Sequence, residues 1–366
     1  MIPTRAPIDV PLTLLAILTG LCSALLVLVV LLLVVTLRRR RESQPTSRPA
    51  ARRGKWTGDF TPFAVGDPGR AAREVRPRPD PRSWDRRDTV LDGITLFRDG
   101  AAAGELRAAS VRGLAHANYG TVRQDEYGYR VTTDGHYVVL AVADGVSAGR
   151  HSDQAAMIVV RRGADLLAQH AGANGLVGIP WPAVLAELAA RVTDRGRQLV
   201  SVGGGAGHSV PDREIADQLA ATALFAVVDL VPGPDGCPVE IMALGDTSAW
   251  VLRNGRWEPQ KPVKNAGAAI ASSGTAAIPV LPATLDAPVR TTVRPGEALV
   301  LVSDGVGDAL GAGCGDVANF LAEVWAWSPR TSLEFAAHVG FARKSFDDDR
   351  TAVALWPTAT TTGHTN

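Results

Sequence analysis

The sequence predicts an α+β fold: an antiparallel β-sandwich flanked by pairs of helices and preceded by one transmembrane helix. Three observations lead to this prediction. Strand-like runs come in groups, helical runs come in pairs between those groups, and one long segment near the N-terminus is apolar and uncharged. The strict alternation of strands and helices that is typical of a doubly wound parallel sheet is not found.

The uncharged segment covers residues 12–37 and reads LTLLAILTGLCSALLVLVVLLLVVTL. It exceeds the roughly 20 apolar residues that a helix needs to cross a bilayer. A cleaved signal peptide is the alternative, but its apolar stretch is usually shorter and follows a basic start. Four arginines at 38–41 follow directly, so the positive-inside rule places the rest of the chain in the cytoplasm. We therefore expect a single-pass protein of the cell membrane that contacts lipid through this one helix.

Composition divides the remainder of the chain. We expect a short tail at 1–11, a linker rich in proline and arginine at 38–90, a folded domain at 91–357 and a disordered tail at 358–366. Prolines in RPRPDPRSWDRRD exclude a helix or a central strand, so the linker is interpreted as a solvated tether. Local docking of its aromatic residues is the alternative; these are Trp56, Phe60, Phe63 and Trp84. The net charge of +1 gives no reason to expect a nucleic-acid partner.

Apolar patterning predicts the elements of the folded domain. Strand candidates are LRAASVRGLAH, EYGYRVTT, HYVVLAVADG, ATALFAVVDL, VEIMALGD, SAWVLRNG, ALVLVSDG and RTAVALW. Spacings of three and four predict helices over 152–170, 182–200, 317–327 and 332–345. The glycine-rich stretch 201–210 lacks the Gly-Lys-Ser/Thr ending of a phosphate loop, so a flexible connection is expected there. Residues 261–288 are irregular, as expected for a lid or a disordered insertion.

Acidic residues recur at the ends of the most apolar strands. Asp144, Asp246 and Asp304 each close such a run, while Asp125 and the triplet at 347–349 precede two others. Asp-Gly is also a common turn, and the chain has six such pairs, so a turn is the simplest explanation of any one of them. Their recurrence at strand ends favours carboxylates that converge in the fold.

Converging carboxylates repel one another unless a cation neutralises them. Mg²⁺ and Mn²⁺ are the hard cations that prefer oxygen ligands. A glycine beside an aspartate lets the backbone approach closely, and its carbonyl is a further ligand. Two ions about 4 Å apart would activate a bridging water and polarise a phosphoryl oxygen.

The order of the pieces resembles the metal-dependent PP2C-type Ser/Thr protein phosphatases of the PPM family, in their bacterial branch. The matching pieces cover about residues 106–356; they are GLAHANYGTVRQDEY, VVLAVADGVSAG, LAATALFAVVDL, MALGDTSAWVLRNG, LVLVSDGVGDAL and DDDRTAVAL. The resemblance implies that Asp144 bridges two Mn²⁺ or Mg²⁺ ions, with the Gly145 carbonyl as a further ligand. It also implies that Asp304 and Asp348 complete one shell.

Further roles are implied by the same resemblance. Asp125 would hold a metal-bound water or ligate directly, and would act with Asp144 in catalysis. Asp217 would hold a third, weaker metal. Asp246 would mainly support a turn near the site, and residues 261–288 would form the flap that touches substrate.

The sequence also departs from the family. An arginine usually precedes the first aspartate and holds the phosphate bidentately. Arg123 lies two residues before Asp125 and Arg112 thirteen before, so neither matches cleanly, and both are kept as candidates. In DDDRT the ligand is one of three aspartates, and alignment to Asp-Asn-x-Thr, with Thr351 matching, favours Asp348.

The general acid is open as well. Val146 stands where some members carry a histidine. His116 and His151 are candidates by proximity in sequence, and a packed or partly exposed histidine is the alternative for each.

We therefore expect a membrane-anchored phosphatase that hydrolyses phosphoserine and phosphothreonine on cytoplasmic proteins, through direct attack of a metal-bound hydroxide. Membrane-bound Ser/Thr kinases are the expected opposing partners. The alternative is a catalytically inactive PP2C-like pseudophosphatase that acts as a binding or sensing module. The absence of a clean arginine favours this alternative, and the retained aspartates oppose it. A phosphatase that controls sigma-factor regulators would share the mechanism and differ in substrate.

Overall fold

The computed structural model describes residues 63–69, 88–203, 211–260 and 276–359, which belong to one unit of the chain. The predicted membrane span at 12–37 lies outside these residues, together with the N-terminal tail, most of the linker and the C-terminal tail beyond 359. Among the helices that the structure does describe, none combines the length and the hydropathy needed to cross a bilayer.

Two antiparallel sheets form the centre of the domain, as the sequence predicts. The six-stranded sheet has the order β1 (Thr89–Arg98), β2 (Ala101–Val111), β11 (Arg350–Pro357), β10 (Ala298–Val302), β7 (Ser248–Arg253) and β8 (Arg256–Pro259). The five-stranded sheet has the order β3 (Glu126–Val131), β4 (Tyr137–Ala143), β5 (Ala223–Asp229), β6 (Cys237–Leu244) and β9 (Val289–Val293).

Strand β4 shows why its apolar run has no polar interruption. Successive side chains of a strand point to opposite faces of the sheet. Val138 and Leu140 belong to the core between the two sheets, whereas Val139 and Ala141 belong to the core beneath the helices. Because both faces of β4 are covered, both sets of side chains are apolar and fully buried.

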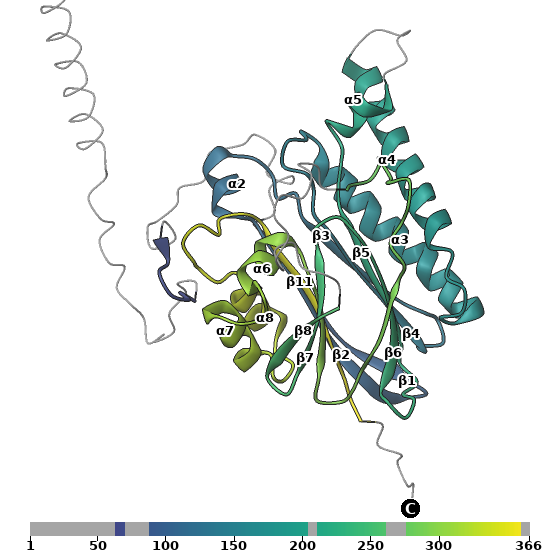
Figure 1. Cartoon of the computed structure of the whole chain (residues 1–366), viewed down its shortest axis with the longest axis vertical. Coiled ribbons are helices and arrows are strands. Elements are labelled where there is room, and N and C mark those ends of the chain that lie inside the picture. Colours follow the sequence, from purple (N-terminus) through teal and green to yellow (C-terminus); the bar gives the residue numbers. More distant parts are fainter. Residues whose placement is uncertain (1–62, 70–87, 204–210, 261–275, 360–366) are drawn as a thin grey trace, which may run out of the picture. The chain divides into compact units, whose positions relative to one another are not determined.

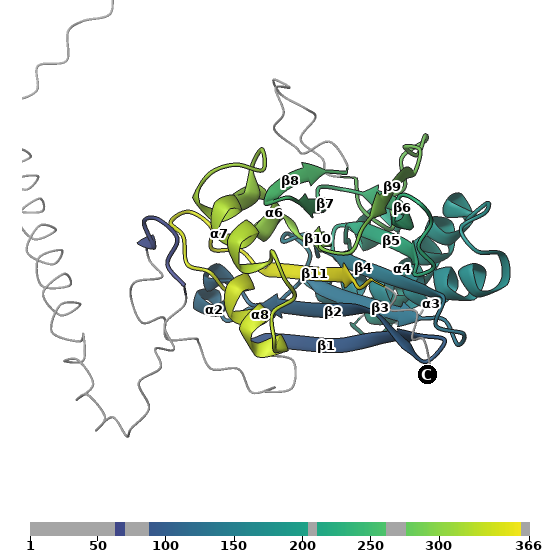
Figure 2. The ribbon, with the colours of Figure 1, turned by 90° about the horizontal axis from the view of Figure 1, so that it is seen from below.

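Helices cover the outer face of each sheet (Figure 1). The long pair α3 (Ser152–Asn174) and α4 (Trp181–Gly203) packs on the five-stranded sheet. Three shorter helices pack on the six-stranded sheet; they are α6 (Asp304–Leu310), α7 (Asp316–Val324) and α8 (Ser332–Val339). Figure 2 shows the sheets between these two helical layers. The predicted sandwich with outer helix pairs is therefore confirmed.

Several elements differ from the sequence prediction. The helix predicted over 332–345 ends at Val339, because the chain beyond Gly340 pairs with residues near 65 instead of continuing the helix. Strands β1, β8 and β9 were not predicted, nor were the helix α6 and the short helices α2 (Leu114–Tyr119) and α5 (Asp212–Ala216). Each is short or lies at a sheet edge, where one buried face leaves only a weak apolar pattern.

Part of the predicted linker packs on the domain. Ala64 and Ala342 form an isolated parallel bridge, and Val65 is buried in the core under the six-stranded sheet. Phe63 lies against the rings of Phe320 and His338. Residues 63–69 therefore dock on the domain through Val65 and Phe63, while several of their side chains stay exposed to solvent.

Candidate metal centre

Asp144 is the first residue after the C-terminal end of β4. Its backbone N–H donates to Thr222 Oγ1 at 2.8 Å, and its carbonyl accepts from the Thr222 N–H at 2.8 Å. Gly145 then bridges to Ala221. The segment that precedes β5 therefore holds the Asp144–Gly145 turn in place.

Three carboxylates converge beside this turn. Asp144, Asp246 and Asp304 each offer an oxygen, and these oxygens lie within 4.8 Å of one another. They line a hollow of about 160 Å³ together with Gly145, Val146, Ser147 and Thr222. The aspartates follow β4, follow β6 and begin α6 respectively, so three separate segments meet here.

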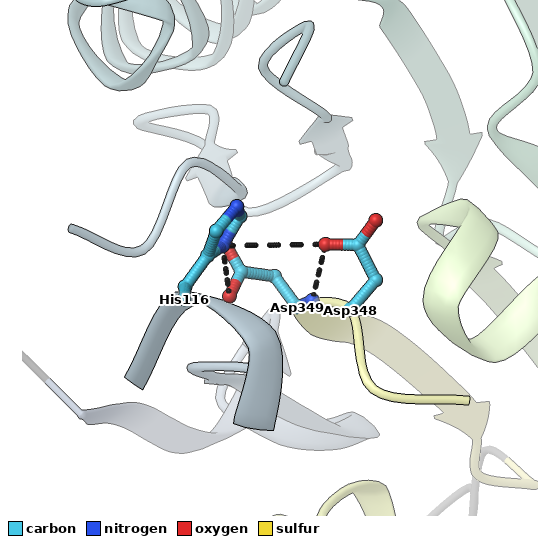
Figure 3. A group of neighbouring side chains, drawn as sticks. All are labelled: His116, Asp348 and Asp349. Carbon is cyan, nitrogen blue, oxygen red and sulfur yellow. Dashed lines mark hydrogen bonds and ion pairs between the residues drawn. The ribbon is translucent and has the colours of Figure 1, made fainter. Parts of the chain in front are cut away.

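A second group lies at the start of β11 (Figure 3). The Nδ1 atom of His116, on α2, is 2.9 Å from Asp349 Oδ1 and 4.0 Å from Asp348 Oδ1. The other ring nitrogen points away from both carboxylates (Figure 3). Asp349 is fully enclosed, whereas the Asp348 side chain is 49 % exposed.

Asp125 connects the two groups electrostatically. It is only 3 % exposed, and burial raises its pKa to about 8, helped by the charges of Asp349 and Asp304 and opposed by hydrogen bonds from Ser303 and Thr351. Within the described part of the chain, its Oδ2 atom is buried without a hydrogen-bond partner. Burial of a carboxylate oxygen without a partner costs free energy unless a cation or a water molecule binds to it.

Two of the carboxylates around the hollow have raised pKa values. Burial raises the pKa of Asp144 well above its usual range, and the charges of Asp125 and Asp304 raise it further. Burial also raises the pKa of Asp304 to about 6, with Asp348 and Asp246 contributing through their charges, while a hydrogen bond from Asp144 opposes the shift. Carboxylates this crowded ionise together only when positive charge is supplied, and an all-oxygen donor set suits Mg²⁺ or Mn²⁺.

The structure brings together most of the predicted ligands. Asp144, Gly145 and Asp304 share one hollow. Asp348 belongs to the second group, although its charge raises the pKa of both Asp144 and Asp304. Asp217 is exposed at the C-terminus of α5 and belongs to neither group.

Neither predicted phosphate-binding arginine has a free guanidinium. Arg123 is buried and donates to Ser110 Oγ at 2.6 Å and to the carbonyl of Asp125. Arg112 is also buried, with Nη2 2.7 Å from Asp88 Oδ1. Both arginines hold the protein's own groups, so a role in binding phosphate remains a prediction.

The described end of the predicted flap adjoins the Asp144 turn. Ile278 and Ala221 exchange two backbone hydrogen bonds, at 2.9 and 3.0 Å. Ala221 therefore lies between Gly145 on one side and Ile278 on the other. The remainder of the flap, 261–275, lies outside the described residues.

Asp349 was not singled out from the sequence. Its carboxylate accepts from the backbone N–H of Gly113 at 2.7 Å and of Gln124 at 2.6 Å. In the sequence, Asp349 is marked only as one of three consecutive aspartates, and such a run does not show which residue is a buried hydrogen-bond acceptor and which is an exposed metal ligand. His116 was considered by proximity, and its pairing with Asp349 adds a reason that the sequence did not contain.

The family model described as protein phosphatase 2C matches residues 112–338. This chain therefore belongs to the protein phosphatase 2C family, whose members are protein-serine/threonine phosphatases, and the resemblance inferred from the sequence is confirmed. No curated protein sequence matches the chain.

Solved structures of similar proteins come from several bacteria. The serine/threonine phosphatase PstP/Ppp of Mycobacterium tuberculosis is 16 % identical with a TM-score of 0.46, covering 70 % of this chain and 100 % of that chain. The PPM Ser-Thr phosphatase MsPP of Mycobacterium smegmatis, in complex with cacodylate, is 20 % identical with a TM-score of 0.40, covering 69 % and 97 %. PppA of Pseudomonas aeruginosa is 17 % identical with a TM-score of 0.42, covering 70 % and 99 %.

Proposed function

We propose that this chain is a membrane-anchored, metal-dependent phosphatase that removes phosphate from phosphoserine and phosphothreonine on cytoplasmic proteins. The observation that carries the proposal is the convergence of Asp144, Asp246 and Asp304 around one hollow, with the unpartnered carboxylate of Asp125 nearby. Membership of the protein phosphatase 2C family supports the class of reaction.

The proposed ligands of two divalent cations are Asp144, the Gly145 carbonyl, Asp304 and Asp348. Mn²⁺ or Mg²⁺, when bound, supplies Lewis acidity toward a phosphoryl oxygen and lowers the pKa of a bound water. We assign to Asp125 the role of accepting a hydrogen bond or proton from such a water, and its buried, unpartnered Oδ2 supports this role. Asp246 shares the hollow, so we add it as a candidate ligand beside its expected supporting role. A third, weaker ion at Asp217 remains part of the proposal.

The anchor is proposed from sequence alone. An uncharged segment at 12–37 is followed by four arginines, a pattern that favours one span with the phosphatase domain in the cytoplasm. Phosphorylated cytoplasmic proteins are then the proposed substrates, and membrane-bound Ser/Thr kinases the proposed opposing enzymes.

One observation favours the second candidate, a pseudophosphatase that binds or senses without turnover. The guanidinium groups of Arg123 and Arg112 are engaged internally, which leaves no predicted arginine to hold a phosphate. Against this stands the cost of burying several carboxylates that a metal-free binding module has no reason to keep.

Phosphate release from a phosphothreonine peptide separates the two candidates. The full-length chain, purified in detergent, is assayed with Mn²⁺ and with a chelator, beside the variant Asp144→Asn and the control Asp235→Asn, whose carboxylate is 75 % exposed. Turnover that requires Mn²⁺ and is lost only in Asp144→Asn supports the phosphatase. A folded wild-type chain without turnover supports the binding module. Extraction of the full chain from membranes by detergent but not by alkaline carbonate tests the anchor.

A further inference from the structure

Residues 63–69 pair with the segment that leads to Asp348. The Val65 N–H donates to the Ala342 carbonyl at 3.0 Å, and the Ala342 N–H donates to the Phe63 carbonyl at 2.7 Å. Two residues further along, the Lys344 N–H donates to the Asp67 carbonyl at 2.7 Å. The two segments therefore run side by side over several residues, although nearly 280 positions separate Val65 from Arg343.

Side chains reinforce this pairing. Val65 is only 7 % exposed, and the Phe63 ring lies 5.4 Å from the ring of His338. Arg343 donates to the Val65 carbonyl at 3.3 Å and pairs with Asp316 at 2.9 Å. Burial of the Val65 side chain removes apolar surface from water, and this favours the docked position of the segment together with the backbone hydrogen bonds.

The far end of the same loop is also fixed. The Ala115 N–H donates to the Asp347 carbonyl at 2.9 Å. Gly113 lies so close that a Cβ there would stand 2.3 Å from the carbonyl carbon of Asp348. Residues 341–347 are thus held at one end by residues 63–69 and at the other by the start of α2.

Asp348 itself has few contacts that could fix its position. Its side chain is half-exposed. Its Oδ1 accepts the backbone N–H of its own neighbour, Asp349, at 2.8 Å and lies 4.0 Å from His116 Nδ1. The position of its carboxylate therefore depends on the backbone around it. The buried Asp349 and β11 hold this backbone on the C-terminal side, and the loop at 341–347 holds it on the N-terminal side.

We propose that residues 63–69 are a positioning strap for the metal ligand Asp348, so that a segment between the predicted anchor and the phosphatase domain is coupled to the metal affinity of the site. This inference rests on the proposed metal-dependent function. Releasing the strap lets the loop at 341–347 move, and Asp348 moves with it. Disturbing a residue that orients a metal ligand typically lowers metal affinity by 10- to 100-fold.

The test uses the metal-free full-length chain in detergent, with Mn²⁺ affinity measured by calorimetry. Val65→Ser releases the buried anchor of the strap, and Phe63→Ala is a milder variant at a position that is 45 % exposed. Ile179→Ser is the matched control, because Ile179 is 8 % exposed, nearly the same as Val65, and packs under the other sheet. Trypsin cleavage after Arg343 and Lys344 reports whether the loop has been released, independently of any metal.

If residues 63–69 position Asp348, Val65→Ser should bind Mn²⁺ about tenfold more weakly and should be cleaved faster after Arg343 and Lys344. Phe63→Ala should show smaller changes in the same direction. Ile179→Ser should lower the melting temperature and leave both readouts unchanged. Wild-type affinity in Phe63→Ala and Val65→Ser, in a chain that binds Mn²⁺ and hydrolyses phosphopeptide, would overturn the strap alone. If Val65→Ser does not fold, Phe63→Ala decides. A folded wild-type chain that binds no Mn²⁺ would overturn the proposed function together with the strap.

Discussion

His116 Nδ1 lies 2.9 Å from Asp349 Oδ1, and this pair joins α2 to the start of β11 directly beside the proposed ligand Asp348. The same Asp349 oxygen accepts the Gly113 N–H, and the second oxygen accepts the Gln124 N–H. Asp349 is therefore a buried acceptor for two backbone N–H groups from the segment that precedes β3, and it faces the imidazole of His116. Burial lowers the pKa of His116, but hydrogen bonding and charge from Asp349 outweigh it and raise the pKa overall.

Replacing Asp349 by asparagine should destabilise the metal-free chain. The amide group that replaces Oδ2 would face the Gln124 N–H, so two donors would meet in a buried place. Loss of such a bond costs about 1–3 kcal/mol, and little repulsion is relieved in return because the pKa of Asp125 already lies near 8. Urea unfolding in chelator measures the change. Asp348→Asn is the control, since its half-exposed carboxylate should tolerate the change; equal stabilities of both variants would contradict this account.

The metal-free chain should lose stability as the pH rises. The folded-state pKa values of Asp125 and Asp304, about 8 and about 6, lie above the ordinary value of 3.8. Folding therefore takes up protons at pH values between 3.8 and the folded-state pKa of each group. The resulting stabilisation is present at low pH and is lost as the pH rises through 6 to 8. Melting temperatures in chelator should therefore fall from about pH 5 to about pH 8, and Mn²⁺ should reverse the fall. A melting temperature that rises over this range without metal would refute the crowding of these carboxylates.

Asp144→Asn should have opposite effects on stability with and without metal. Without metal it removes a carboxylate that two neighbours repel, so the chain should become more stable near pH 8. With Mn²⁺, the wild-type chain should gain stability from binding, and the variant should gain much less. Thermal melting of both proteins in chelator and in Mn²⁺ gives all four values. A variant that is less stable in chelator would indicate that Asp144 is held mainly by structural bonds.

Gly305→Ala should be far more damaging than an ordinary glycine substitution. A Cβ at Gly305 would stand 1.9 Å from the Asp349 carbonyl oxygen, so α6 and the start of β11 would have to separate. Overpacking of this kind typically costs 1–3 kcal/mol, and here it also displaces Asp304. Gly172→Ala is the control. Gly172 lies in α3, where alanine is favoured over glycine, and the nearest atom that its Cβ would meet belongs to Thr132, at 3.6 Å. Urea unfolding should show a loss at Gly305 and none at Gly172.

The sequence predicted the sandwich and four of its outer helices, α3, α4, α7 and α8, because these depend on long apolar patterns. The Asp-Gly pairs show where such reasoning stops. Gly135 has a φ of 73° and lies in the turn between β3 and β4. Gly145 and Gly305 need no positive φ; their Cβ atoms would collide with Gln124 and Asp349 respectively. The same dipeptide therefore serves turns and close packing, and only long-range contacts distinguish the two uses.

The docking of residues 63–69 shows the same limit. Val65 is a single buried residue in a segment of mixed composition, and no period marks it as part of the core. Its partners lie nearly 280 positions away, and pairing over such a separation leaves no local signal. The choice between Asp348 and Asp349 was likewise made by alignment to a family pattern, since burial separates them only in the folded chain.

Strand β11 lies between β2 and β10, in the middle of the six-stranded sheet, and Asp348 and Asp349 come just before it. During synthesis this strand leaves the ribosome after the rest of the described domain, so the sheet has an open gap until then. Pairing across such a long stretch of chain is a late folding event. The predicted anchor would already be in the bilayer by that time. A nascent chain that stops before β11 therefore lacks a central strand of the six-stranded sheet, and the start of this strand is where Asp348 and Asp349 join the carboxylates of the other segments.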